Sequence, residues 1–205
     1  MMPPLSEWTV WITGFVGRVP AFDSVMSIIV SDFLIPVSIA LIMLGLWVGY
    51  SNPVRRSQIH RTIMGASVSI GISTLVVFLI NSANKFWPRP YDVTDPAVRD
   101  AATHAAQTIF YLPHDPSFPS NAATITFAAA TGVWFGNRKA GALLYALASL
   151  WVLARFYGGI HFFVDILGGA IIGTVTAVLI CKVFMPATEP LPTWALRLAR
   201  FLYIA

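Results

Sequence analysis

The sequence predicts an all-α fold, a polytopic membrane helix bundle of five transmembrane helices, or six, with interfacial helices at both ends. Of its 205 residues, 57% are hydrophobic and 11% are charged, whereas a soluble domain carries about 25% charged residues. Long uncharged stretches lack the alternation of β-strands, and open sheet edges cannot face lipid. Residues 1–205 are expected to form one membrane-embedded domain, and the lone Cys181 excludes an internal disulfide.

The N-terminal residues 1–30 are interpreted as an interfacial segment. Residues 5–16 are apolar and too short to span a bilayer, and Trp8 and Trp11 suit headgroup depth. A sixth, short span is the alternative for this stretch. The first basic residue is Arg18, so no ordinary signal peptide is expected.

Five apolar stretches carry the predicted spans: residues 33–50, 62–84, 119–137, 140–154 and 166–181. A span needs about 20 residues to cross about 30 Å of hydrocarbon. The last two stretches are shorter, which predicts that Arg155 and Asp165 lie slightly below the membrane surface on one side. Two pairs of glycines spaced four residues apart, in the third and fifth stretches, favour close helix packing.

Basic residues predict the orientation of the bundle. Five spans would place most of them on one side, namely Arg55, Arg56, Arg61, Arg138, Lys139, Lys182, Arg197 and Arg200. The positive-inside rule makes that side cytoplasmic. Residues 186–205 are then a cytoplasmic interfacial tail, and residues 85–118 lie on the other side.

Polar residues from four segments converge on that other, outer side. They are Lys85, Arg89 and Pro90 after the second span, Ser120 and Asn121 before the third, Arg155 closing the fourth, and His161 and Asp165 before the fifth. Ionisable residues at a membrane edge are costly, which makes them functional candidates. Taken singly, each has a simpler interpretation, such as a helix N-cap or an arginine that reaches the interface. Taken together, they favour a functional site.

The residue types suit phosphate chemistry without a metal. Arginine forks fit phosphoryl oxygens, and a helix start attracts anions. His161 and Asp165 are four residues apart and share a helix face. The carboxylate can therefore hold Nδ1 and leave Nε2 free to attack phosphorus. No metal-ligand cluster is evident, so we expect no cofactor and a phosphohistidine intermediate.

These residues resemble the three motifs of the type 2 phosphatidic acid phosphatases (PAP2 family), Lys-x6-Arg-Pro, Pro-Ser-Gly-His and Ser-Arg-x5-His-x3-Asp. Here they read KFWPRP at residues 85–90, FPSNAA at 118–123, and Ala154-Arg155 followed at motif spacing by His161 and Asp165. The resemblance covers roughly residues 20–185. The compact layout is most similar to the undecaprenyl pyrophosphate phosphatase branch.

The resemblance implies a role for each matched residue. His161 would be the nucleophile and Asp165 its orienting partner. The phosphate would be held by Lys85, Arg89, Ser120 and Arg155 and the backbone amide of Asn121. It also implies a metal-independent lipid phosphatase in the bacterial inner membrane, with its site on the extracytoplasmic face and no nucleic acid partner.

Three positions depart from the family pattern. Ala154 replaces the motif serine, and Lys85 lies three residues after Ser82, where the family has its lysine. Ala122 stands where the family has the histidine that protonates the leaving oxygen. Such general acid catalysis typically raises the reaction rate about 10²–10⁴-fold.

The alanine has three explanations. It can be a deliberate His-to-Ala change, which we favour. Another group such as His114, or a water, can serve instead. Last, the chain can be a natural pseudoenzyme.

Three functions follow as hypotheses. The leading one is hydrolysis of undecaprenyl pyrophosphate to the monophosphate. A phosphatidic acid or phosphatidylglycerophosphate phosphatase is the close alternative, because the motifs contact only the phosphate. The alternative of another class is a catalytically dead protein that binds or transports lipid phosphates, supported by Ala122 alone.

Overall fold

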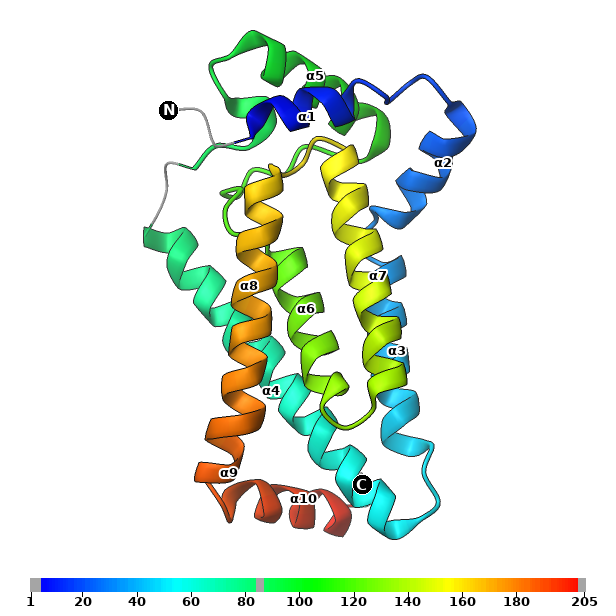
Figure 1. Cartoon of the computed structure of the whole chain (residues 1–205), viewed down its shortest axis with the longest axis vertical. Helices are drawn as coiled ribbons and strands as arrows, with labels where there is room; N and C mark the ends of the chain where they lie inside the picture. Colours follow the sequence, from blue (N-terminus) through cyan, green and yellow to red (C-terminus); the bar gives the residue numbers. More distant parts are fainter. Residues whose placement is uncertain (1–4, 84–86, 203–205) are drawn as a thin grey trace.

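The described part of the chain is built from helices. The computed structural model describes residues 5–83 and 87–202. Its α-helices are α1 Ser6–Thr13, α2 Pro20–Ile29, α3 Leu34–Val48, α4 Pro53–Ala83, α5 Pro96–Ile109, α6 Asn121–Trp134, α7 Arg138–Tyr157, α8 Phe163–Leu179, α9 Met185–Ala187 and α10 Leu191–Phe201 (Figure 1). A 3₁₀ turn, η1 (Pro90–Asp92), precedes α5, and a π-helical turn, η2 (Ile180–Phe184), joins α8 to α9. These ranges contain no strand, which confirms the all-α prediction.

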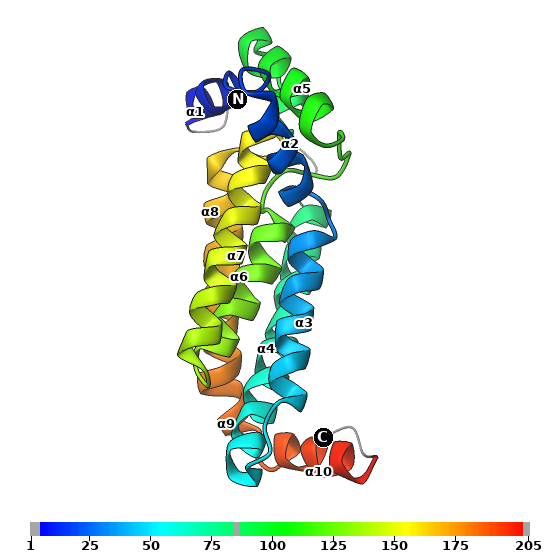
Figure 2. The ribbon, with the colours of Figure 1, turned by 90° about the vertical axis from the view of Figure 1, so that its right-hand side faces the viewer.

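Helix α6 forms the centre of the bundle. It packs against α4, α7 and α8, and most of its side chains are buried. With 14 residues it is about 21 Å long, shorter than the span expected over 119–137. A helix enclosed by its neighbours does not have to match the bilayer thickness, because protein and not lipid surrounds it (Figure 2).

Small residues allow the helices around α6 to approach closely. An added Cβ at Gly169 of α8 would collide with the carbonyl oxygen of Ser120, and one at Gly173 would collide with that of Thr124. The other predicted pair also faces α4: an added Cβ at Gly132 of α6 would collide with Ala66, and one at Gly136, just after α6, would collide with the Thr62 side chain. Both glycine pairs are therefore helix contacts, as the sequence predicts.

Three described helices are long and apolar enough to cross a membrane: Pro53–Ala83, Arg138–Tyr157 and Phe163–Ala187. Helices α2 and α3 pass the same test as a pair bent by 48°, which gives four if the pair is one broken span. Residues 20–29, predicted to belong to an interfacial segment, form the first half of this pair. The count of five spans stays a prediction.

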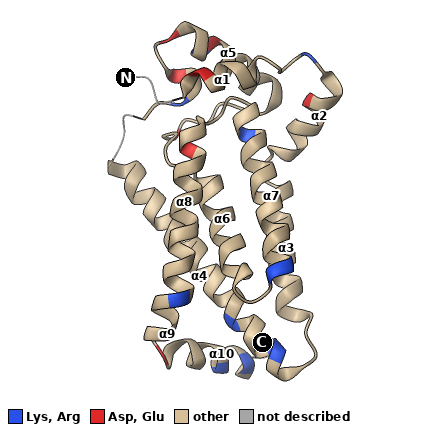
Figure 3. Ribbon diagram, in the orientation of Figure 1, with Lys and Arg blue, Asp and Glu red and all other residues tan. Residues whose placement is uncertain are grey.

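Short helices lie across both ends of the bundle. Helix α1 lies with α5 over one end, and α10 lies across the other (Figure 1). An ion pair links Arg61 of α4 to Glu189, just before α10, and Arg200 of α10 donates a 2.9 Å hydrogen bond to the Ser57 hydroxyl of α4. Basic residues gather at the α10 end, while acidic residues predominate at the α5 end (Figure 3). This asymmetry is the one on which the predicted orientation rests.

Candidate active site

A polar cavity of about 370 Å³ lies at the α5 end of the bundle, where α7 ends and α6 and α8 begin. Five residues singled out in the sequence line it: Arg89, Asn121, Ala122, Arg155 and His161. They come from four separate segments of the chain. The fold thus brings these predicted site residues together.

His161 lies in the turn between α7 and α8, and 3% of its surface is exposed. Its Nδ1 lies 3.3 Å from the Ser117 hydroxyl oxygen and 3.7 Å from Oδ2 of Asp165. The Ser117 hydroxyl also donates to Asp165 Oδ2, at 2.5 Å. A proton on Nδ1 therefore points to the Ser117 hydroxyl oxygen, and that hydroxyl in turn donates to the Asp165 carboxylate. Nε2 is left as the ring nitrogen available to a substrate.

Asp165 is fully buried in the first turn of α8. Its carboxylate accepts three hydrogen bonds, from the Ser117 hydroxyl, from Trp87 Nε1 at 3.0 Å and from the Phe162 backbone N–H at 2.8 Å. These donors replace the water that the buried carboxylate has lost. They also fix its position behind the His161 ring.

Burial governs the protonation of His161. The turn that carries it lies outside the helices, but the ring is enclosed by protein. Loss of water disfavours the charged imidazolium and lowers the pKa of His161, and this outweighs the opposing effect of the nearby Asp165 carboxylate. The neutral ring that a nucleophile requires is therefore favoured.

Arg89 is buried and donates hydrogen bonds to three acceptor atoms. Its Nε and one terminal nitrogen donate to the backbone oxygen and the carboxylate of Asp115, both at 2.8 Å. The other terminal nitrogen donates to the Ile160 backbone oxygen at 3.0 Å, next to His161. The Arg89 guanidinium thus lies beside His161, the candidate nucleophile, while the exposed Asp115 carboxylate is bonded to one side of the guanidinium.

Arg155 lies in the last turn of α7 and is paired with Asp32. Its guanidinium carbon lies 4.7 Å from the centre of the Trp151 ring and 5.3 Å from that of Phe110. Its Nε is buried and has no hydrogen-bond partner. Tyr111 donates to the other oxygen of Asp32 at 3.0 Å. Arg155 therefore presents a fixed, incompletely satisfied cation to the cavity.

The start of α6 forms another part of the wall. Ser120 is the N-cap, fully buried, and its hydroxyl accepts from the Ala123 N–H at 3.4 Å. The Ser120 N–H donates to the Asp165 backbone oxygen at 3.0 Å. Asn121 and Ala122 line the cavity, whereas Ser120 does not. The predicted phosphate contact at this helix start is thus best offered by Asn121.

His114, the predicted auxiliary group, does not line the cavity. It is exposed on the segment after α5, and its neighbours Pro113 and Asp115 line the cavity instead. Lys85 lies outside the described residues. The described part of the chain contains no group of three or more His, Cys, Asp or Glu residues that could hold a metal ion.

Sequence reasoning missed several residues of the site. Ser117 and Trp87 hold Asp165, and neither carries a charge that would mark it in the sequence: Trp87 lies inside the first motif region, and Ser117 directly precedes the second. Asp32 had a usable signal, because a carboxylate beside a predicted span is costly unless it is paired. Its partner, Arg155, lies 123 residues later in the chain.

Comparison with known proteins identifies the family. A family model described as the PAP2 superfamily matches residues 62–189, more than half of the chain and all of the motif residues. The chain belongs to the PAP2 superfamily. Its family and its membrane-spanning helices make it a multi-pass membrane protein of a phosphatase family. The all-helical membrane fold and the resemblance to the PAP2 family, both predicted from the sequence, are confirmed.

Two relatives illustrate the range of the superfamily. The chain is 30% identical over 159 residues to undecaprenyl-diphosphatase BcrC of Bacillus subtilis. The matched residues cover 77% of this chain and 72% of the relative. A transmembrane PAP2 type phosphatidylglycerolphosphate phosphatase from Bacillus subtilis, solved by crystallography, superimposes with a TM-score of 0.57 at 20% identity, over 92% of this chain and 90% of the other. At that identity the second likeness concerns the fold alone.

Proposed function

We propose that this PAP2 protein removes the terminal phosphate of undecaprenyl pyrophosphate, without a metal and through a phosphohistidine at His161. The observation that carries the proposal is the His161–Ser117–Asp165 arrangement between two buried arginines. A protein that only binds lipid phosphate needs the arginines but has no use for an oriented, neutral imidazole. The similarity to undecaprenyl-diphosphatase BcrC supports this choice of substrate.

The chemistry consists of two displacements at phosphorus. Nε2 of His161 attacks the terminal phosphorus, the bond from phosphorus to the bridging oxygen breaks, and the lipid monophosphate leaves with that oxygen. Water then attacks the phosphohistidine, and inorganic phosphate leaves as the phosphorus–nitrogen bond breaks. Arg89, Arg155 and the first turn of α6 stabilise the negative charge on the equatorial oxygens in both steps. Asp165 stabilises the positive charge on the ring through Ser117.

Ala122 limits the first step. It lies on the cavity wall and cannot give a proton to the leaving group. A phosphate leaving group needs a proton less than an alkoxide does, so a pyrophosphate substrate reduces this deficit. Restoring a histidine here is expected to raise the rate by about 10²–10⁴-fold.

The site is proposed to face the extracytoplasmic side of a bacterial cell membrane. The basic residues around α10 lie at the end opposite to the cavity (Figure 3). By the positive-inside rule that end is cytoplasmic. The lipid head would then meet the arginines at the outer leaflet.

A phosphatidylglycerophosphate phosphatase is the second candidate, because a protein of the same fold carries that name. The two substrates differ in their tails and in their leaving groups. A pyrophosphate releases a phosphate, whereas phosphatidylglycerophosphate releases an alkoxide, which the chain with Ala122 serves poorly. Activity on the second lipid should therefore depend more strongly on the Ala122→His substitution.

The test measures phosphate release in detergent with EDTA, from undecaprenyl pyrophosphate and from phosphatidylglycerophosphate. The chain is compared with its Ala122→His variant and with the double variant that also carries His161→Ala. Turnover of the prenyl lipid by Ala122→His, lost in the double variant, supports the proposal. Equal release by the double variant would exclude His161 as the nucleophile.

A further inference from the structure

A second polar cavity, of about 510 Å³, lies at the α10 end of the bundle. This end is opposite to the one that holds the active site (Figure 1). One wall is a face of α4, another is the end of α6, and the segment from η2 to Glu189 closes the third side. We call it the α10-end cavity; its charged, amide and hydroxyl side chains are Arg55, Gln58, Arg61, Thr62 and Glu189. Its volume is within the range of ligand sites, about 300–1,000 Å³.

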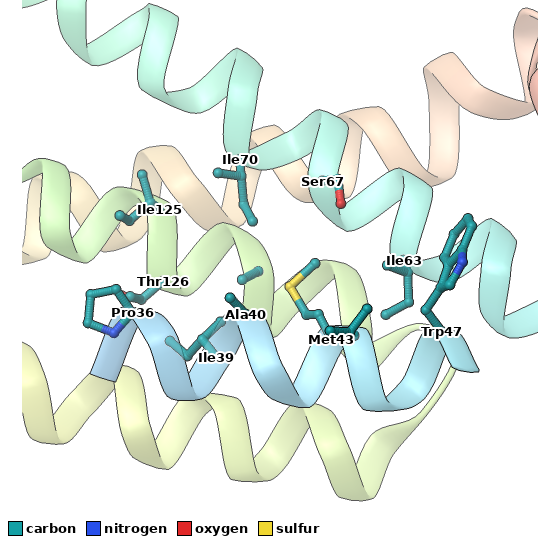
Figure 4. A pocket seen from close by; sticks show the side chains of 12 residues that line it. Pro36, Ile39, Ala40, Met43, Trp47, Ile63, Ser67, Ile70, Ile125 and Thr126 are labelled. Atoms are coloured by element: carbon teal, nitrogen blue, oxygen red, sulfur yellow. The ribbon is translucent and has the colours of Figure 1, made fainter. Parts of the chain in front are cut away.

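The apolar groove between α3 and α4 has a different chemistry. Figure 4 shows Ile39 and Met43 of α3 facing Ile63 and Ile70 of α4, and none of the described residues that line this groove carries a charge. The groove adjoins the active-site cavity, with which it shares Pro36. An anion outside the active site would therefore find its counter-ions in the α10-end cavity and not in this groove.

One wall of the α10-end cavity presents a fixed arginine. Arg55, Gln58 and Thr62 are spaced three and four residues apart, so they lie on one face of α4. Arg55 donates to the Gly136 backbone oxygen at 3.2 Å and to the Gln58 side chain at 3.3 Å. These bonds hold its guanidinium across the gap between α4 and the end of α6. Both acceptors are neutral, so they do not cancel its positive charge.

The second arginine of the cavity already holds an anionic group. Arg61 forms an ion pair with Glu189 and donates to the Thr193 hydroxyl at 3.2 Å. That hydroxyl donates in turn to the other carboxylate oxygen of Glu189, at 2.8 Å. The Glu189 carboxylate thus shows where oxygen atoms of an anion can be bound in this cavity.

Positive charge exceeds negative charge around the cavity. Lys182 places its Nζ 4.3 Å from the centre of the Phe135 ring, and this ring is part of the wall. Among the described residues at this end, Glu189 is the one that carries a carboxylate side chain (Figure 3). Arg55, Arg61 and Lys182 therefore outweigh it. Guanidinium forks fit the oxygens of a phosphate, which makes a phosphate group the anion that suits this cavity.

An apolar hollow of about 270 Å³ adjoins the α10-end cavity, and Met185 lines both spaces. Met64 and Val68 of α4 form one side of the hollow, and Phe184 and Leu191 form the other. The two spaces together are cationic on one side of Met185 and apolar on the other, which is the complement of a phospholipid.

The position of the cavity favours a membrane lipid over a soluble anion. Its walls belong to two helices that are long and apolar enough to cross a membrane, Pro53–Ala83 and Phe163–Ala187. A lipid in the leaflet at this end can therefore reach the cavity from the side. Basic pockets between membrane helices bind phospholipid head groups in this way.

We propose that the α10-end cavity is a second lipid site, which binds the phosphate of an anionic phospholipid from the leaflet at this end. Arg55 and Arg61 hold the phosphate, which takes the place of the Glu189 carboxylate on Arg61. An acyl chain passes over Met185 into the apolar hollow. The proposal goes beyond the proposed function and does not depend on it, because no residue lines both this cavity and the active site.

The first experiment measures the dissociation constant of phosphatidylglycerol by native mass spectrometry of the full chain in detergent. Arg55→Gln should weaken binding about tenfold, because it removes one charge-assisted contact. Arg56→Gln removes the same charge from the next residue of α4, which does not line the cavity, and should leave the constant unchanged. Lipid bound at the active site contributes equally to both variants, so their difference reports on the α10-end cavity.

The second experiment removes the competing carboxylate. Glu189→Gln keeps the size of the side chain and frees Arg61, so phosphatidylglycerol should bind about tenfold more tightly. A gain of affinity cannot result from a misfolded variant. Unchanged or weaker binding by Glu189→Gln would overturn the proposal.

Three further outcomes would also overturn it. Equal weakening by Arg55→Gln and Arg56→Gln would assign the attraction to diffuse surface charge. Equal affinity for phosphatidylcholine, which has the same tails and no net charge, would assign it to the tails alone. Glycerol 3-phosphate bound as tightly as the whole lipid would show that the ligand is a soluble phosphate and not a membrane lipid.

Discussion

Ser117 donates its hydroxyl proton to Oδ2 of Asp165 across 2.5 Å, although the two residues lie 48 positions apart in the chain. The same hydroxyl oxygen is within 3.3 Å of His161 Nδ1. The direct distance from Nδ1 to the carboxylate is longer, at 3.7 Å. Asp165 therefore acts on the imidazole largely through a serine that the motif spacing does not contain.

The first prediction concerns this serine as a positioning residue. In the Ala122→His background, Ser117→Ala should lower kcat about 10–100-fold, because a hydrogen bond to a charged group contributes about 1.5–3 kcal/mol. KM should change little, since Ser117 does not line the cavity. Steady-state kinetics with undecaprenyl pyrophosphate measure both.

Ser117→Thr keeps the hydroxyl and should recover most of the lost kcat. Ser27→Ala removes an exposed hydroxyl of α2 that bonds only to the Ser24 backbone, and it serves as the control for serine loss. If Ser117→Ala raised KM and left kcat unchanged, the serine would belong to binding and not to orientation of His161.

The second prediction concerns pH. Burial lowers the pKa of His161 below its ordinary value of 6.5, so the unfolded chain takes up this proton at a higher pH than the folded one. Above about pH 6.5 the His161 ring is neutral in both the folded and the unfolded chain, and it has no effect on stability. Below that pH the unfolded chain binds the proton first, so the folded state loses stability until the pH reaches the pKa of His161 in the folded chain. Titration of histidine-labelled protein by NMR, assigned with His161→Gln, should give a midpoint below 6.5. A midpoint at or above 6.5 would contradict it.

The third prediction concerns the contact between α6 and α8. Gly173→Ala brings a methyl group onto the Thr124 carbonyl, and overpacking of this kind costs about 1–3 kcal/mol. Gly71→Ala adds the same methyl group on α4, where nothing lies within 4 Å, and should leave stability unchanged or slightly raised. Thermal unfolding in detergent compares the two. Equal melting temperatures would show that the helices can separate without penalty.

The sequence was most informative where a rule acts over a short distance. The glycine pairs, the terminal helices and the convergence of Arg89, Arg155 and His161 follow from hydropathy, spacing and topology, and the structure contains them. Helix ends were less predictable. Helix α6 is shorter than its apolar stretch because neighbouring helices enclose it, and α2 joins α3 as a bent pair that no local signal marks. Partners such as Asp32 depend on contacts between distant segments, which spacing alone does not reveal.

The last prediction concerns Asp32, which holds Arg155 from the break between α2 and α3. Its carboxylate is paired with the guanidinium that would hold a phosphate oxygen, so a substrate must compete with Asp32 for Arg155. Asp32→Asn removes the competing charge and keeps an acceptor for Arg155, which should tighten binding of orthovanadate about tenfold. Asp100→Asn removes an exposed charge paired with Arg99, away from the cavity, and should have no effect. Inhibition constants decide the question: weaker binding in Asp32→Asn would mean that the carboxylate positions Arg155 for the phosphate and does not compete with it.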